Sequence, residues 1–169
     1  MTILETDRLY LRQLTLEDAG FILELVNEPA WLRFIGDRGI RTADDAQAYL
    51  LNGPVESYQR RGFGLYRVEL KADGSPLGIC GLIKREALPD VDIGFAFLAN
   101  FWGQGYATES ASAVLAFAQN TLGLKRIVAI TDPANERSIR ILEKLGLRFE
   151  QMVRLSDDGS ELKLFACEV

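Results

Sequence analysis

Residues 91–121 place a strand, two closely spaced glycines and a long helix in direct succession, and this order constrains the fold more than any other feature. The apolar run 91–98 predicts a buried strand, and residues 104–121 predict the strongest helix of the chain. Gly103 and Gly105 allow a tight turn between them and leave backbone N–H groups unshielded. Free N–H groups and the positive end of a helix dipole suit a phosphate. A tight turn without a ligand is the alternative interpretation.

Two common nucleotide motifs do not fit this segment. GxGxxT resembles the dinucleotide fingerprint GxGxxG, but Thr108 stands where the third glycine belongs. The segment also follows an antiparallel meander instead of a first parallel strand, and no acidic residue occurs at 125–130, where the ribose ligand would fall. A P-loop requires GK[ST], which the chain lacks. These observations argue against a Rossmann or P-loop nucleotide site.

The order of predicted elements indicates an α+β, or mixed α/β, fold around one sheet. No linker or repeat divides residues 1–169, so we expect one domain. Strands are expected at 7–12, 64–70, 76–84, 91–98, 125–131, 147–155 and 161–168. Helices are expected at 16–26, 43–51, 104–121 and 135–145. A further short helix is expected after a break at Gly53-Pro54 and ends at about residue 61.

Composition excludes several classes of chemistry. The chain has no histidine, which removes Ser-His-Asp and Cys-His catalysis and histidine-ligated metals. Cys80 and Cys167 are isolated, so no zinc or other metal site is expected; they are interpreted as reduced core residues, with one disulfide as the alternative. A net charge of −5 argues against nucleic acid and suits a cationic acceptor. No signal peptide or membrane span is evident, and a cytoplasmic location is expected.

Three segments resemble the GNAT acetyltransferases, and specifically the branch related to the ribosomal-protein N-terminal (RimJ/RimL-like) acetyltransferases. They are FWGQGYATE (101–109), ETDRLYLRQLTLEDA (5–19) and DPANERSIRILEKLGLRFE (132–150). Gly105 and Ala107 match the small positions of the family's phosphate-binding motif [RQ]xxGx[GA], whereas Trp102 departs from its usual Arg or Gln. The resemblance covers nearly the whole chain in the family's order. It implies a mostly antiparallel mixed sheet whose middle strands splay apart.

The resemblance also implies acetyl-CoA as co-substrate. Its pyrophosphate would lie on the N–H groups of residues 104–108, its pantetheine arm would pair with 97–99, and Asn135 would contact the cofactor near the thiol. A plain helix N-cap is the alternative for Asn135, and both roles are compatible. The implied cofactor-binding residues are Phe97, Leu98, Ala99, Trp102, Gly103, Gln104, Gly105, Tyr106, Ala107, Thr108, Asn135 and Ser138.

Direct attack of an amine on the thioester needs a base to take the amine's proton. The resemblance points to Asp92, because several GNAT enzymes carry a strand carboxylate at this place. On a period of two, Asp92 shares a strand face with Gly94 and Ala96, which would suit a substrate cleft. The alternative is an ordinary solvated carboxylate. Glu86 and Glu109 are weaker candidates.

Two further groups complete the chemistry that the family uses. A backbone N–H near Phe97 or Leu98 would stabilise the oxyanion. Many members place a tyrosine acid where this chain has Leu142, and the N-terminal acetyltransferase branch suggests Ser138 as a hydrogen-bond donor to the leaving thiolate. A first-turn helix serine without a catalytic role is the alternative for Ser138.

The family resemblance implies that residues 28–41 and 54–64 border the acceptor cleft. Trp31, Phe34 and Tyr58 either line this cleft or belong to the core and surface, and Arg33, Arg38 and Arg41 either bind a substrate carboxylate or peptide or are solvated. The expected activity is N-acetylation of a primary amine, either a protein N-terminus or a small molecule. The alternatives are a non-catalytic acyl-CoA-sensing or scaffold domain of the same fold and an unrelated nucleotide-binding module. Family members are often dimers, so a homodimer is an option.

Overall fold

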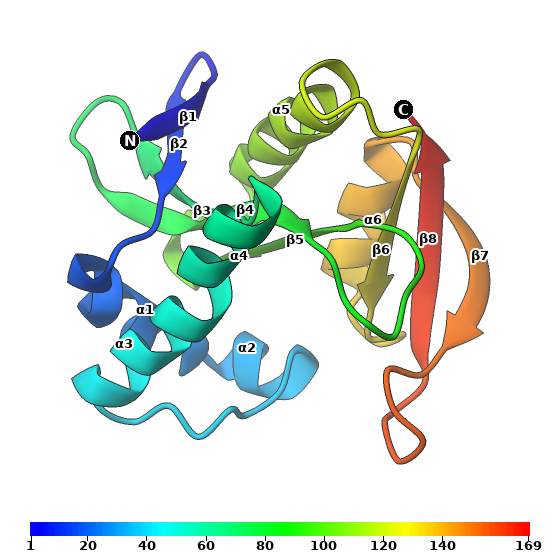
Figure 1. Cartoon of the computed structure of the whole chain (residues 1–169), viewed down its shortest axis with the longest axis horizontal. Coiled ribbons are helices and arrows are strands. Elements are labelled where there is room, and N and C mark those ends of the chain that lie inside the picture. Colours follow the sequence, from blue (N-terminus) through cyan, green and yellow to red (C-terminus); the bar gives the residue numbers. More distant parts are fainter.

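The computed structural model describes all residues 1–169 and forms one eight-stranded sheet with helices on both faces (Figure 1). The strands are β1 (Thr2–Glu5), β2 (Leu9–Gln13), β3 (Leu65–Leu70), β4 (Pro76–Ile83), β5 (Asp92–Phe97), β6 (Arg126–Thr131), β7 (Arg148–Val153) and β8 (Leu162–Glu168). The helices are α1 (Ala19–Val26), α2 (Pro29–Phe34), α3 (Ala43–Leu50), α4 (Glu56–Arg61), α5 (Tyr106–Asn120) and α6 (Glu136–Lys144). The mixed α/β fold expected from the element order is confirmed.

The sheet has the order β1-β2-β3-β4-β5-β6-β8-β7, and only the β5–β6 pair is parallel. These two strands pair at a single register position, Asp92 opposite Val128, where the Val128 N–H donates to the Val91 carbonyl at 3.1 Å. Beyond this point β5 and β6 separate, and Figure 1 shows the opening between them. The splayed middle strands that the family resemblance implied are therefore present.

Two apolar clusters hold the helices on opposite faces of the sheet. α5 packs on β4 and β5, and its buried residues Ala111, Val114 and Ala118 belong to the larger cluster. On the other face α1, α2 and α3 bury a second cluster against Ile79 and Leu98. Side chains alternate along β5 as expected, because Phe97 joins the first cluster whereas Ala96 packs against the second. β5 is thus fixed from both faces, while one of its edges is left open.

Most predicted elements lie within a few residues of the observed ones, but two were missed and one break was wrong. β1 and α2 were not predicted: β1 is a short edge strand next to charged residues, and α2 has only six residues. Gly53-Pro54 does not interrupt the helix. A π-helical turn at Leu51–Val55 carries the chain from α3 into α4, because the wider turn accommodates the missing N–H of Pro54.

Candidate active site

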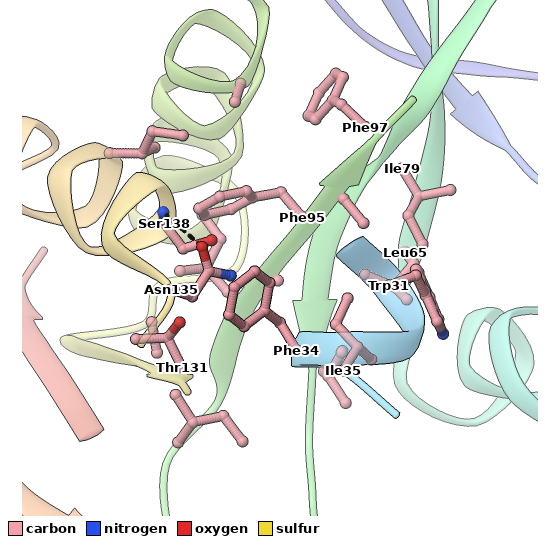
Figure 2. A pocket seen from close by; sticks show the side chains of 18 of the residues that line it. Trp31, Phe34, Ile35, Leu65, Ile79, Phe95, Phe97, Thr131, Asn135 and Ser138 are labelled. Atoms are coloured by element: carbon pink, nitrogen blue, oxygen red, sulfur yellow. Dashed lines mark hydrogen bonds between the residues drawn. The ribbon is translucent and has the colours of Figure 1, made fainter. Parts of the chain in front are cut away.

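A cleft of about 1400 Å³ opens between the separated strands. Figure 2 shows its two walls: Asn135 and Ser138 of α6 lie on one side, Trp31 and Phe34 of α2 on the other. β5 runs between them and contributes Phe95 and Phe97, among other residues. The cleft therefore lies where three separate parts of the chain meet at the open edge of β5.

The predicted phosphate loop lies at one end of this cleft. Gly103 has φ +78° and Gly105 has φ +84°, a left-handed conformation that glycine adopts without strain. α5 begins at the next residue, and the first N–H groups of a helix have no intrahelical partner. Gly103, Gly105, Tyr106, Ala107 and Thr108 line the cleft, whereas Gln104 is not among its lining residues. The loop thus presents unpaired N–H donors at the positive end of a 15-residue helix.

Arg8 and Glu109 hold the start of α5 in place. The Glu109 carboxylate accepts hydrogen bonds from the Thr6 hydroxyl, from the Arg8 N–H at 3.0 Å and from Arg8 Nε at 2.7 Å. Burial disfavours the Glu109 charge, but these hydrogen bonds outweigh it and lower the pKa. The Arg8 guanidinium also lies over the Tyr106 ring, 4.4 Å from its centroid. Glu109 is therefore committed to structure, which argues against its use as a base.

Trp102, which departs from the family motif, ties the loop to β5. Its Nε1 donates to the Phe97 carbonyl at 2.9 Å, and the Arg137 guanidinium of α6 lies 4.0 Å from its ring centroid. An indole between the strand and α6 takes the space of the expected Arg or Gln. Trp102 and Phe97 both line the cleft.

The backbone of β5 offers its free groups at odd-numbered residues. The Leu98 N–H donates to Leu77 of β4 at 2.9 Å, whereas the carbonyls of Val91 and Phe97 accept from groups on the other side. Successive residues of a strand point their backbone groups to opposite edges, so Phe95 and Phe97 point their N–H groups toward the opening. The Leu98 N–H is thus already bonded, and of the two donors considered for the oxyanion only the Phe97 N–H faces the opening. Leu98 and Ala99 do not line the cleft, and the Ala99 N–H donates to Glu28.

Asn135 is the N-cap of α6. Its side-chain oxygen accepts from the Ser138 N–H at 3.3 Å, the contact drawn in Figure 2. The Asn135 amide nitrogen and the Ser138 hydroxyl have no partner in the protein, and both residues line the cleft. Leu142 is 2% exposed and packs in the larger apolar cluster, so the position of the family's tyrosine supplies no hydroxyl here.

Asp92 lies at the point where β5 and β6 meet, and its environment differs from both interpretations of the sequence. It is only 1% exposed, so it is not a solvated carboxylate, and it is not among the residues that line the cleft. Its Oδ2 accepts from Arg85 Nε at 2.8 Å, while its buried Oδ1 has no hydrogen-bond partner. Burial raises the Asp92 pKa against the opposing charge of Arg85. Glu86 is exposed and lies outside the cleft.

The residues proposed for the acceptor divide into two groups. Trp31, Phe34 and Arg38 line the cleft, and the buried Trp31 Nε1 has no hydrogen-bond partner. Tyr58 is a core residue: its hydroxyl accepts from the Leu14 N–H at 3.0 Å, donates to the Leu65 carbonyl, and its ring stacks on Tyr66.

Two of the three arginines suggested by the sequence lie elsewhere. The Arg33 guanidinium lies 4.6 Å from the Phe34 ring centroid, and Arg41 pairs with Asp37 on the surface. Sequence reasoning missed Tyr49 and Arg85, which line the cleft. Tyr49 reads as one more apolar residue of a helix, and Arg85 lies in the β4–β5 connection, for which no pattern predicts a direction.

Cys80 and Cys167 are both free, and burial raises the pKa of the Cys80 thiol to about 12. No three metal-binding side chains of the His, Cys, Asp and Glu types lie together. None of the helices has the length and apolar character needed to cross a membrane.

Comparison with known proteins gives a consistent match. Residues 8–148 match the model of the acetyltransferase (GNAT) domain. The uncharacterized protein YkkB of Bacillus subtilis is 30% identical over 156 residues, covering 90% of this chain and 89% of YkkB. The uncharacterized N-acetyltransferase YoaA of the same organism is 30% identical over 154 residues, covering 90% of this chain and 86% of YoaA.

Solved structures share the fold. A GNAT-family acetyltransferase from Bacillus anthracis superposes with a TM-score of 0.81 at 23% identity, over 99% of this chain and 98% of that one. RimL, a ribosomal L7/L12 alpha-N-protein acetyltransferase in complex with coenzyme A, superposes with a TM-score of 0.83 at 17% identity, over 100% and 98% of the two chains. With the domain match over residues 8–148, the chain belongs to the GNAT family and is an acetyltransferase.

Proposed function

We propose that the protein is an acetyl-CoA-dependent N-acetyltransferase that acetylates a primary amine, either a protein N-terminus or a small molecule. The observation that carries the proposal is the pair of left-handed glycines that start α5 at the open edge of β5. This arrangement joins a phosphate-binding helix start to a strand edge with free backbone groups, as an extended pantetheine diphosphate requires. Bound acetyl-CoA supplies the activated acetyl thioester.

The protein's own groups fit the charged end of this co-substrate. The N–H groups of residues 104–108 bind the pyrophosphate oxygens, and a side chain at Gly105 would occupy their space. The Arg8 guanidinium lies next to this position, since a Cβ built on Gly105 would be 3.4 Å from Arg8 Nη2. Arg8 therefore adds a positive charge to the donors of the helix start.

The open edge of β5 fits the pantetheine arm. The N–H groups of Phe95 and Phe97 face the opening, where they would hold the amide groups of the arm as an added strand is held, while the Phe97 carbonyl already accepts from Trp102. The same N–H groups are the donors available to the oxygen that gains negative charge when the amine attacks. Asn135 and Ser138 face this edge from α6, and the free Ser138 hydroxyl donates a hydrogen bond to the departing sulfur.

We assign Asp92 as the base that takes the proton of the attacking amine. Its Oδ1 has no partner, its pKa is raised by burial, and it lies at the closed end of the opening. Because Asp92 does not line the cleft, the proton reaches it through an intervening water. The small neighbours Gly94 and Ala96 leave room on the same face for the amine to approach.

A non-catalytic acyl-CoA-binding domain is the second candidate. The pairing of Asp92 with Arg85 and the apolar Leu142 at the tyrosine position favour it. Such a domain would bind acetyl-CoA with the same contacts and transfer no acetyl group.

Calorimetric titration with acetyl-CoA tests the proposal, with Gly105→Glu and Gly123→Glu as a matched pair. Both glycines have positive φ, so both substitutions carry a similar backbone strain of about 1–2 kcal/mol. Only Gly105 lies in the cleft. We expect binding to the native protein and to Gly123→Glu, and none to Gly105→Glu.

Release of coenzyme A from acetyl-CoA in the presence of amines then separates the two candidates. Transfer to any amine supports the enzyme, whereas binding without transfer to N-terminal peptides, amino acids or polyamines supports the non-catalytic domain. Absence of acetyl-CoA binding to the native protein would contradict both.

A further inference from the structure

The half of the cleft that borders α2, α3, α4 and the β4–β5 connection is basic, although the whole chain has a net charge of −5. We call it the acceptor half. The basic residues that line it are Arg38, Arg60, Arg61, Lys84 and Arg85, and the acidic residues that line it are Glu28 and Glu56. This local excess of positive charge opposes the binding of a plain cationic amine.

The two acidic residues of the acceptor half already have partners. A Glu28 carboxylate oxygen accepts from the Ala99 N–H at 3.0 Å, and Glu56 pairs with Arg60 at 3.2 Å. Arg85 pairs with the buried Asp92 at 2.8 Å, whereas Arg38 and Arg61 have no carboxylate partner.

Arg85 is held in a fixed direction. Its Nε donates to the buried Asp92 at 2.8 Å, which leaves both terminal nitrogens of the guanidinium without a partner in the protein. The side chain is 30% exposed and lines the cleft. A guanidinium anchored at Nε presents its two terminal N–H groups as a planar fork, the geometry that binds a carboxylate with two parallel hydrogen bonds.

Arg38 and Tyr49 are two further polar residues of the acceptor half. Arg38, on the α2–α3 connection, forms no ion pair in the structure, and both residues line the cleft. Burial raises the Tyr49 pKa, and the charges of Arg38 and Arg85 both oppose that rise. Two cations from different connections therefore lie near enough to the Tyr49 hydroxyl for their charges to act on it, and all three residues line the cleft.

From this arrangement we infer that the acceptor is a small amine that carries a free carboxylate close to the reacting nitrogen, namely an α-amino acid. The inference rests on the proposed N-acetyltransferase function and names its substrate class. Arg85 and Arg38 bind the carboxylate, with the Tyr49 hydroxyl as a third donor. Trp31, Phe34 and Ile35 form an apolar wall of the cleft, which fits an apolar side chain (Figure 2).

The charge arrangement argues against a protein N-terminus as the main acceptor. The α-amine of a peptide is followed by a neutral amide, which would leave Arg38 without an anion, and the terminal nitrogens of Arg85 without a carboxylate, in a partly desolvated cleft. Unpaired buried charge is costly in a complex. The same argument disfavours polyamines, whose remaining cations would be repelled.

A comparison of two matched pools of acceptors tests the inference. A pool of apolar L-amino acids and a pool of their carboxamides are each incubated with the protein and acetyl-CoA, with coenzyme A release and mass spectrometry as readouts. The two pools differ only in the carboxylate. We expect kcat/KM for the acids to exceed that for the amides by at least about tenfold, as the loss of a charged hydrogen-bonded pair predicts.

Three variants test which residues recognise the carboxylate of the acceptor. Arg38→Gln and Tyr49→Phe are expected to raise KM for the acids by about tenfold or less, with a smaller change in kcat, and to leave acetyl-CoA affinity unchanged. Arg33→Gln removes the same charge from α2 outside the cleft and is expected to stay within about twofold of the native protein.

Equal use of acids and amides, use of neither pool, or an Arg38→Gln variant with native preference would overturn the inference. The proposed function is judged separately, by acetyl-CoA calorimetry and by transfer to N-terminal peptides and polyamines. Transfer to those amines alone leaves the acetyltransferase in place and removes the amino-acid acceptor. Absence of both binding and transfer removes both.

Discussion

The guanidinium of Arg8 lies 2.7 Å from the Glu109 carboxylate, and this ion pair joins the β1–β2 turn to the first turn of α5. Thr6 donates to the same carboxylate. The N-terminal hairpin is thereby attached to the helix that starts at the phosphate loop. The position of Arg8 beside Gly105 depends on Glu109, so a residue outside the cleft controls a charge at its edge.

Glu109→Gln is expected to lower the free energy of unfolding by about 1–2 kcal/mol, because a partly buried set of charge-assisted hydrogen bonds is weakened. It is also expected to weaken acetyl-CoA binding severalfold, since Arg8 is released. Urea unfolding and calorimetry measure the two effects. Glu136→Gln, which changes an exposed charge of α6, serves as the stability control. Unchanged stability in Glu109→Gln would contradict the role of the ion pair.

The environment of the Asp18 carboxylate allows a prediction of how the free energy of unfolding depends on pH. Burial disfavours its charge, but hydrogen bonds from Arg12, Thr15 and Arg67 outweigh burial and lower its pKa. Because the folded pKa lies below the unfolded value of about 4, the stabilisation is fully present above that value and is lost as pH falls through the folded pKa. Urea unfolding from pH 7 down to pH 2 should show this loss.

Asp18→Asn is expected to cost about 2–3 kcal/mol at pH 7, because two partly buried arginines lose one of the two carboxylates that they share and keep only Glu69. Its stability should also depend less steeply on pH below 4 than that of the native protein. The exposed Asp157→Asn is the control. If Asp18→Asn keeps the native pH dependence, other groups cause the loss of stability at acidic pH.

Asp92→Asn tests the proposed base. kcat/KM of the native enzyme should rise with pH through the raised pKa of Asp92, because the ionised carboxylate accepts the proton. The variant should lose this limb and about 10²-fold in rate, while acetyl-CoA still binds. Glu86→Gln, an exposed change in the adjacent connection, should behave as the native protein. A rate loss with an unchanged pH profile would indicate that Asp92 acts only by holding Arg85.

Ser138→Ala separates the hydroxyl from the cap of α6. Asn135 accepts from the Ser138 backbone N–H, which alanine retains, so the stability should change little. kcat should fall about tenfold if the hydroxyl stabilises the departing sulfur, as the loss of one such donor predicts. Asn135→Ala removes the cap and should cost about 1 kcal/mol of stability. A native kcat in Ser138→Ala would show that Ser138 is a helix residue without a catalytic role.

Local patterns were sufficient for most of the fold. The Asn135 cap and the glycine turn at Gly103 and Gly105 depend on chemistry within a few residues, and the sequence indicated both. The capping boxes at Thr15 and Thr42 are equally local. β1 was missed because a four-residue edge strand gains its stability from its partner β2, not from its own pattern. The helix through Pro54 was missed because a π-helical turn overrides a local breaking signal.

The site was less predictable because it depends on pairings distant in sequence or on side-chain directions in connections. The engagement of the Leu98 N–H follows from the register of β4 against β5, which no local pattern specifies. Asp92 pairs with Arg85 of the β4–β5 connection, a contact that no local pattern specifies. Period-two alternation placed Asp92 on one face of β5 with Gly94 and Ala96, but it says nothing about whether that face is open at the position of Asp92.

The single register pair between Asp92 and Val128 makes the sheet two half-sheets connected at one point. Without a ligand, β5 and β6 are two internal edges with exchangeable backbone amides, and α5, which packs on β4 and β5, contacts α6, which packs on β6. A molecule that bridges both edges therefore acts as a ninth strand and couples the halves. Saturation at about 100 times Kd would add about 2.7 kcal/mol to the stability, and amide exchange should slow along Ile93–Phe97 in particular.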